Sequence, residues 1–197
     1  MYEVQRRLVE EREREREALT DPLTGLGNRR ALEERLAILH PIAERYQRPF
    51  SVISIDADGL KARNDSDGHE AGDRAIRHLA EVLRATMRSV DQCVRLGGDE
   101  FVVLLPDTGA ATATIAAERL LAALRAPSSS APPGGALRAS VGVAEWVPGL
   151  SPQDVIRRAD VLLYEAKRLG KDRVISDPPR PWSELLSVRA PSVPLGS

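Results

Sequence analysis

Three acidic residues stand where apolar segments end, and carboxylates in such places can bind a cation. Asp56 follows the apolar, β-branched run 50–55, and Asp99 and Glu100 lie at the tip of a predicted hairpin. Neighbouring strands would bring them to one rim, where crowded carboxylates either share protons or bind a cation. Oxygen ligands without His or Cys suit Mg²⁺, which usually takes one or two carboxylates together with substrate phosphates. The alternative is a polar turn and an ordinary surface aspartate.

The segment after Asp56 carries groups suited to a nucleotide. A strand that runs into a short polar loop and then a helix presents backbone N–H groups to a phosphate, and Lys61 adds a positive charge. Asn64 and Asp73 supply an amide and a carboxylate, the pair that can bind the acceptors and donors of a guanine edge. Equally, asparagine is a common turn residue, and an aspartate in a first helical turn compensates the helix dipole.

Two lysines close a predicted helix, Lys167 and Lys171. Like charges at this i,i+4 spacing repel by about 0.2–0.5 kcal/mol on an isolated helix, so the pair favours an anion nearby. A polyphosphate would satisfy both. Placement at a helix end beside Glu165 is the plain alternative.

Several elements would position these groups. Asn28 is a good N-cap for a helix over 29–46, and one apolar face predicts a helix over 70–87 after a polar loop. Turn chemistry and apolar runs predict the rest in chain order: strand 50–55, hairpin strands 92–96 and 101–105, helix 110–124, strand 137–146, helix 152–168 and strand 173–175. We therefore predict an α/β fold of the α+β sandwich kind with a ferredoxin-like β-α-β-β-α-β core and an N-terminal helix.

Composition excludes several classes of protein. The 197 residues carry 28 Lys+Arg and 29 Asp+Glu, a formal net charge of −1, which argues against a nucleic-acid partner. The single cysteine, Cys93, cannot form an internal disulfide, and three dispersed histidines with one cysteine give no zinc site. No apolar run approaches the ~18 residues of a membrane span, and the charged amino terminus is no signal peptide. We expect a cytoplasmic protein without a membrane segment.

Three segments are predicted along the chain. Residues 1–18 are rich in Glu and Arg and read either as a solvated helix with i,i+4 pairs or as the stub of a dimerising, signalling helix with a short apolar seam. Residues 19–176 form the predicted domain. Residues 177–197 are rich in Pro and Ser, and we expect them to be disordered.

On these residues the sequence resembles the GGDEF family of diguanylate cyclases, whose domains have a nucleotide-cyclase or palm-type fold. Residues 97–101 read Gly-Gly-Asp-Glu-Phe and follow Arg95-Leu96. Four further blocks resemble the family's motifs in the right order: 21–30, 56–73, 139–143 and 159–174. A lone Gly-Gly-Asp-Glu-Phe would be weak support, but five ordered blocks over about residues 19–176 make chance agreement negligible.

The resemblance implies roles for individual residues. The metal ligands would be Asp56, Asp99, Glu100 and the carbonyl of Ala57, binding Mg²⁺ with Mn²⁺ as an alternative. The catalytic groups would be Asp99, Glu100 and Lys61. Guanine would be bound by Asn64 and Asp73, and the rest of GTP by Gly98, Lys61, Lys167 and Lys171.

The implied reaction condenses two GTP molecules into cyclic di-3′,5′-GMP with release of two pyrophosphates. One rim holds one GTP, so a homodimer with two-fold symmetry is expected. Arg88 and Asp91 match the family's Arg-x-x-Asp site, where the product acts as a feedback inhibitor, and Arg119 would belong to a secondary part of it. The alternative is a cation at a helix end followed by a turn aspartate.

Two other functions stay open from the sequence alone. One is a sensor that retains GTP or cyclic di-GMP binding without turnover, and the other is a cyclase for a different nucleotide. The signature is intact, which favours the enzyme. Leu60 and Asp172 depart from the residues usual in the family, Phe and Asn. We expect the Asp172 carboxylate beside Lys171 to weaken phosphate binding somewhat.

Overall fold

The chain alternates short strands with longer helices. The computed structural model describes residues 5–6, 17–126 and 136–178. Its named elements are α2 (Arg29–Tyr46), β1 (Phe50–Ala57), α3 (Leu60–Asp67), α4 (His69–Thr86), β2 (Gln92–Gly97), β3 (Glu100–Pro106), α5 (Ala110–Arg125), β4 (Ala139–Glu145), α6 (Pro152–Arg168) and β5 (Val174–Ser176). Most of the predicted helix over 1–18 and of the predicted tail over 177–197 lies outside the described residues.

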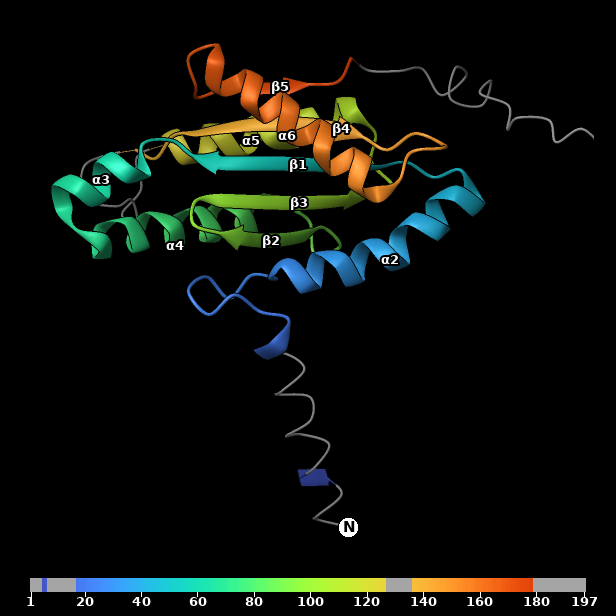
Figure 1. Cartoon of the computed structure of the whole chain (residues 1–197), viewed down its shortest axis with the longest axis horizontal. Helices are drawn as coiled ribbons and strands as arrows, with labels where there is room; N and C mark the ends of the chain where they lie inside the picture. Colours follow the sequence, from blue (N-terminus) through green and yellow to red (C-terminus); the bar gives the residue numbers. More distant parts are fainter. Residues whose placement is uncertain (1–4, 7–16, 127–135, 179–197) are drawn as a thin grey trace, which may run out of the picture.

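Five strands form one mixed sheet in the order β2-β3-β1-β4-β5 (Figure 1). The first four strands pair antiparallel, and β5 runs parallel to β4. Elements β1, α4, β2, β3, α5 and β4 follow one another in the β-α-β-β-α-β order. The predicted α+β fold with a ferredoxin-like core is therefore confirmed, with α2, α3, α6 and β5 added to it.

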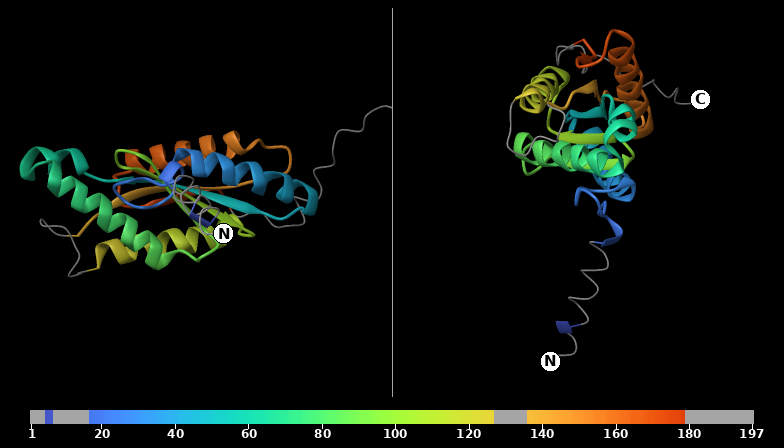
Figure 2. Two further views of the ribbon diagram at one scale, coloured as in Figure 1. Left: turned by 90° about the horizontal axis from the view of Figure 1, so that it is seen from below. Right: turned by 90° about the vertical axis from the view of Figure 1, so that its left-hand side faces the viewer.

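Helices cover both faces of the sheet, α2 and α6 on one and α4 and α5 on the other (Figure 2). Side chains alternate between the faces, as they must along a strand. Val52 and Val102 belong to the core under α2 and α6. Ile53 and Val103 belong to the core under α4 and α5. Because Asp56 and Glu100 continue the even-numbered series, their side chains project on the α2 and α6 face of the sheet.

Helix α6 lies unusually close to β4. A Cβ atom at Gly142 would lie 2.1 Å from the carbonyl oxygen of Ala159 and 2.3 Å from the backbone nitrogen of Leu163. Only glycine allows this approach. The helix begins with a capping box between Ser151 and Asp154, so its start is fixed as well as its distance from the sheet. Its last turns, with Lys167, therefore lie over the end of β1.

The prediction of a polar loop between β1 and the next helix was wrong. Residues 60–67 form helix α3, which begins after Gly59 at φ 78° and ends at Gly68 at φ 80°. The segment has no apolar periodicity, because only Leu60 packs against the core. Helix α3 is therefore supported by its neighbour α4 and by two flanking glycines with positive φ rather than by a buried face.

The other predicted elements are confirmed to within two residues at nearly every end. The Asn28 side chain accepts a hydrogen bond from Ala31 N at 3.1 Å, so it caps α2 as predicted. None of the helices within the described ranges is long and apolar enough to cross a membrane.

Candidate active site

Asp56 and the signature turn meet at one end of the sheet. Asp56 at the end of β1 lies opposite Glu100 at the start of β3. The backbone N–H of Ala57 donates a hydrogen bond to the carbonyl of Asp99 at 3.2 Å. The prediction that these acidic residues come from neighbouring strands at a common rim is confirmed.

The Asp56 carboxylate is buried and carries an ion pair. Its Oδ2 lies 2.6 Å from Nζ of Lys167, which comes from the last turns of α6. Burial raises the pKa of Asp56, and the charges of Asp99 and Asp58 act in the same direction, whereas the hydrogen bond and charge of Lys167 oppose them. Asp56 therefore lies in surroundings that favour a nearby cation.

Within the described ranges, no three acidic, histidine or cysteine side chains converge as a ready metal cage. The donors nevertheless fit a Mg²⁺ ion, because that ion usually needs only one or two carboxylates and takes its other ligands from phosphates and water. Asp56 already attracts the ammonium group of Lys167 at 2.6 Å, and its pKa responds to the charge of Asp99. Residues at this rim are thus suited to a divalent cation that arrives with a polyphosphate.

Two glycines shape the turn between β2 and β3. Gly97 has φ 142° and Gly98 has φ 54°, and the register shifts between Arg95 and Gly97. Positive φ at successive positions favours glycine over residues with a Cβ. The guanidinium of Arg95 donates to the Gly98 carbonyl from Nε at 3.1 Å and from Nη2 at 2.9 Å. The turn is therefore held by a side chain of the strand that leads into it.

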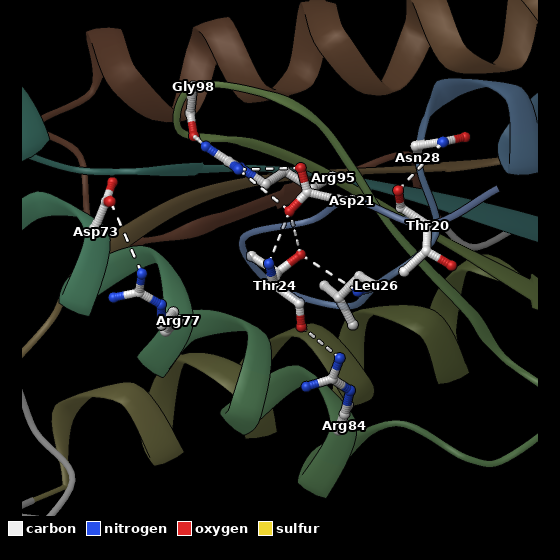
Figure 3. Close-up of polar contacts among 10 residues, drawn as sticks. All are labelled: Thr20, Asp21, Thr24, Leu26, Asn28, Asp73, Arg77, Arg84, Arg95 and Gly98. Carbon is white, nitrogen blue, oxygen red and sulfur yellow. Dashed lines mark hydrogen bonds and ion pairs between the residues drawn. The ribbon is translucent and has the colours of Figure 1, made fainter. Parts of the chain in front are cut away.

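Arg95 is fixed in turn by Asp21, a residue 74 positions earlier (Figure 3). Nη1 of Arg95 lies 3.1 Å from Oδ2 and 3.2 Å from Oδ1 of Asp21. Asp21 also accepts from the N–H and hydroxyl of Thr24 at 2.9 and 2.6 Å. Burial alone would raise the pKa of Asp21, but the hydrogen bonds from Thr24 and Arg95 outweigh it and leave that pKa lowered. The segment 20–27 thus supports the signature turn from behind.

The predicted guanine-binding residues lie on the α3–α4 hairpin. Oδ1 of Asn64 is buried and has no hydrogen-bond partner among the described residues. It packs so closely on Gly72 that a Cβ atom there would lie 1.9 Å from it. Asp73 is exposed one residue further along α4, with its carboxylate 3.9 Å from Arg77 (Figure 3). The hairpin brings Asn64 and Gly72, the neighbour of Asp73, into contact, although eight positions separate them in the sequence.

The three lysines assigned to phosphates have different surroundings. Lys61 is exposed in the first turn of α3. Lys167 binds Asp56. Lys171 follows α6 and lines a cavity of about 300 Å³ with Gly59, Arg63, Arg138 and other residues. Lys167 therefore lies at the acidic rim, whereas Lys171 lines the cavity beside Gly59 and Arg63, and the phosphate roles of all three lysines stay predictions.

Asp172, which we expected beside Lys171, pairs with two arginines. Its carboxylate lies 2.9 Å from Nε of Arg125 and 3.8 Å from Nε of Arg138. These ion pairs oppose the negative charge of Asp172, and its effect on phosphate binding stays a prediction. This pairing could not be predicted from the sequence, because the three residues lie far apart along the chain.

The predicted product-site residues contact one another. Oδ1 of Asp91 lies 2.9 Å from Nη2 of Arg88, which also donates to Oγ1 of Thr108 at 2.7 Å. Arg119 hydrogen-bonds the carbonyl of Thr86, two residues before Arg88. The group lies near Pro106, at the end of β3 away from Glu100. It is therefore a separate surface from the acidic rim.

Asp58, which holds the loop beside the site, was not identified from the sequence. It accepts hydrogen bonds from the Ser140 hydroxyl at 2.9 and 3.1 Å and from the backbone N–H of Asp172 at 3.0 Å. The available signal was its spacing, since it stands two residues after Asp56, in the loop that follows β1. Asp58 joins that loop to β4 and to the turn after α6.

A mixed sheet in this order, with an acidic rim where β1 ends and β3 begins, defines an α+β domain of the palm-like nucleotide-cyclase class. The sequence model described as "Diguanylate cyclase, GGDEF domain" matches residues 18–173. The chain therefore belongs to the GGDEF domain family.

Named relatives and solved structures agree with this assignment. The diguanylate cyclase DgcP of Pseudomonas aeruginosa is 41% identical over 160 residues, which are 80% of this chain and 24% of DgcP. The probable diguanylate cyclase DgcC of Escherichia coli is 37% identical over 177 residues, 87% of this chain and 47% of DgcC. The crystal structure of the coiled coil and GGDEF domain of DgcB from Caulobacter crescentus, in complex with c-di-GMP, superposes with a TM-score of 0.83 at 32% identity. That alignment covers 89% of this chain and 94% of the DgcB chain.

The chain spans only part of its curated relatives. It matches 24% of DgcP and 52% of the diguanylate cyclase DgcS of Shewanella oneidensis. The matched part is the GGDEF domain itself.

Proposed function

We propose that this protein is a diguanylate cyclase that converts two GTP into cyclic di-3′,5′-GMP and two pyrophosphates. In each half-reaction the 3′-hydroxyl oxygen of one GTP attacks the α-phosphorus of the other. The new P–O bond forms as the bond to the β-phosphate oxygen breaks, and pyrophosphate leaves. The carboxylate of Asp99 accepts the hydroxyl proton. The register that sets Asp56 opposite Glu100, beside Lys167, is the observation that carries this proposal.

Acidic groups at the rim would hold Mg²⁺, with Mn²⁺ as an alternative. The ligands are Asp56, Asp99, Glu100 and the carbonyl of Ala57. When bound, the ion neutralises phosphate charge and lowers the pKa of the attacking hydroxyl. The burial of Asp56 and the nearby charge of Asp99 support a cation at this place. Positioning and charge neutralisation supply most of the catalysis in phosphoryl transfer.

The nucleotide would lie across the rim. Asn64 and Asp73 bind the guanine edge, and the packing of Asn64 on Gly72, the neighbour of Asp73, supports a shared role. The backbone at Gly98 approaches the nucleotide closely, because no Cβ blocks it. Lys61, Lys167 and Lys171 bind the triphosphate, with Lys61 also stabilising charge in the transition state.

Two copies of the domain would have to face each other. One rim binds one GTP, and the attacking hydroxyl belongs to a second GTP, so a symmetric homodimer completes the reaction. Cyclic di-GMP would inhibit by binding at Arg88 and Asp91, with Arg119 beside them. The substrate, a nucleoside triphosphate, and the reducing conditions suited to the lone Cys93 are consistent with a cytoplasmic protein.

The test is an assay with GTP and Mg²⁺ over a range of protein concentrations. We expect cyclic di-GMP as the product and a specific activity that rises with protein concentration until dimers predominate. Asp99→Ala should lower kcat by about 100-fold or more, because charge stabilisation at the reacting phosphate is lost. Glu118→Ala, an exposed substitution on α5, should leave kcat unchanged.

The outcomes separate the enzyme from its alternatives. GTP binding without product at high protein concentration would favour a sensor. Equal turnover of ATP and GTP would contradict the guanine contacts of Asn64 and Asp73.

A further inference from the structure

The turn between α6 and β5 has an unusual backbone. Gly170, Lys171 and Asp172 have φ values of 110°, 62° and 48°. Two consecutive non-glycine residues with positive φ are disfavoured unless neighbouring groups hold them. The Lys171 N–H donates to the carbonyl of Ala166 at 3.0 Å, which ties the turn to the end of α6. Neighbouring groups must also hold Asp172, the next residue.

Arg125, the last residue of α5, forms two hydrogen bonds with Asp172. Its Nε lies 2.9 Å from Oδ1 of Asp172, and its Nη2 donates to the backbone carbonyl of the same residue at 2.7 Å. The two side chains are 42% and 22% exposed, so the pair is partly shielded from solvent. A guanidinium that binds a side chain and a backbone carbonyl together fixes geometry as well as charge.

The other side of Asp172 is joined to the loop after β1. Its N–H donates to Oδ2 of Asp58 at 3.0 Å. Asp58 is held by the hydroxyl of Ser140, and its own N–H donates to the carbonyl of Arg138 at 2.9 Å. Asp172 therefore connects α5 and the turn that carries Lys171 to the loop after β1, and through Asp58 to β4.

We propose that Asp172, clamped by Arg125, is a positioning residue that sets Lys171 in register with the loop after Asp56. This proposal rests on the proposed function, because it assigns Lys171 to the triphosphate. Asp172 touches no reacting atom in this scheme. It acts through Lys171 on one side and through Asp58 on the other.

The clamp has a physical reason. A lysine on a turn loses side-chain and backbone freedom when it binds a phosphate, and a turn that is already fixed has less freedom to lose. The effect belongs to binding, so it should change the KM for GTP more than kcat.

Arg125→Gln is the variant that tests the clamp, since it keeps Asp172 and its backbone bond to Asp58. We expect faster amide hydrogen exchange at Lys171 and Asp172 in the protein without nucleotide, by about fivefold. We also expect the KM for GTP, and the Kd for a GTP analogue that cannot react between its α- and β-phosphates, to rise about three- to tenfold. The kcat should stay within about twofold.

A matched control and a second background make the test specific. Arg157→Gln removes an exposed arginine that pairs with Asp154 at 3.3 Å at the other end of α6, and it should change none of these quantities. In a Lys171→Ala background, Arg125→Gln should no longer weaken analogue binding. A purely structural role for Arg125 would weaken binding equally with and without Lys171.

The two proposals fail in different ways. Unchanged amide exchange at Lys171 and Asp172 in Arg125→Gln would overturn the clamp, whatever the activity of the protein. Faster exchange with unchanged analogue affinity would overturn the link from the clamp to Lys171. A wild-type protein that binds the analogue but makes no product would overturn the cyclase, while the binding measurements would still decide the clamp.

Discussion

Asp56 ionises in surroundings that oppose its charge. Its pKa is raised, first by burial and then by Asp99 and Asp58, despite the opposing effect of Lys167. A carboxyl whose pKa is higher in the folded state binds an extra proton there, between the unfolded and folded pKa values. Stability from this group is therefore present at lower pH and is lost as the pH rises through the folded pKa. At neutral pH the charged form of Asp56 therefore lowers the free energy of unfolding.

Asp56→Asn should therefore separate stability from activity. At pH 7 we expect a higher unfolding midpoint, because a buried charge is removed, and a loss of activity of about 100-fold or more. Urea titrations at several pH values check the first part, and the GTP assay checks the second. Asp107→Asn, with a side chain 59% exposed, is the control and should leave both unchanged. A lower midpoint for Asp56→Asn at pH 7 would show that its ion pair with Lys167 outweighs the cost of burial.

A substitution at Gly72 tests the proposed guanine contact of Asn64. In Gly72→Ala, the new Cβ would overlap the side-chain oxygen of Asn64, which can rotate away at little cost in stability. We expect the KM for GTP to rise about tenfold with kcat nearly unchanged, and the unfolding free energy to change by less than about 1 kcal/mol. In an Asn64→Ala background the same substitution should have no further effect on KM. An unchanged KM in the single variant would remove Asn64 from the site.

At the scale of elements, the support of the signature turn by Asp21 is the feature with the largest expected effect. Asp21 and Arg95 are 14% and 13% exposed, so their pair is well shielded. Because the pKa of Asp21 is lowered in the fold, its stabilising effect is present at neutral pH and is lost as the pH falls through the folded pKa. Asp21→Ala should lower the unfolding free energy by about 2 kcal/mol. It should also lower kcat about tenfold, because Arg95 no longer fixes the turn that carries Asp99.

The measurements are a urea titration at pH 7 and the GTP assay. Glu34→Ala removes an exposed pair with Arg30 and should cost less than about 0.5 kcal/mol. Full activity in a destabilised Asp21→Ala protein would limit this segment to folding.

Elements with their own local signals could be predicted from the sequence. The helix over 29–46 has an N-cap at Asn28, and the apolar run 50–55 has the pattern of a buried strand. Helix α3 could not be predicted, because it has neither an apolar face nor a side-chain cap. The proximity of the rim carboxylates could be predicted from the topology, since β1 and the hairpin are neighbours in a ferredoxin-like sheet.

Contacts between distant elements could not be predicted in the same way. The Arg95–Asp21 pair joins residues 74 apart, and the Arg125–Asp172 pair joins residues 47 apart. Neither spacing produces a periodic signal, because such pairs depend on how whole elements pack. The packing of Asn64 on Gly72 could not be predicted either, because it depends on how α3 packs against α4.

At the scale of the whole molecule, the predicted product site and the acidic rim lie at opposite ends of β3. Arg88 contacts the carbonyl of Pro106, whereas Glu100 begins the strand. Six residues at about 3.3 Å each put these ends about 20 Å apart. A product bound at Arg88 therefore cannot block GTP in the same subunit by contact, and inhibition would have to act on how two subunits approach each other.

Arg88→Ala tests this arrangement. We expect the cyclic di-GMP concentration for half-inhibition to rise about tenfold or more, because a guanidinium contact is lost, with kcat within about twofold of wild type. Thr108→Val removes a hydrogen bond of Arg88 but keeps its charge, and it should remain inhibited. Initial rates at increasing product concentration provide the measurement. An unchanged inhibition curve in Arg88→Ala would remove the product site from the proposal.

The Lys167–Asp56 contact has a consequence for how the rim stays folded before any substrate arrives. With its ammonium 2.6 Å from a buried carboxylate, Lys167 gives Asp56 a counter-charge from within the fold. The proposed magnesium–nucleotide complex would bring one partner for each of these groups, a cation for the aspartate and a phosphate for the lysine. Binding of that complex would then exchange the partners of two ion pairs, and neither Asp56 nor Lys167 would lack an opposite charge during the exchange.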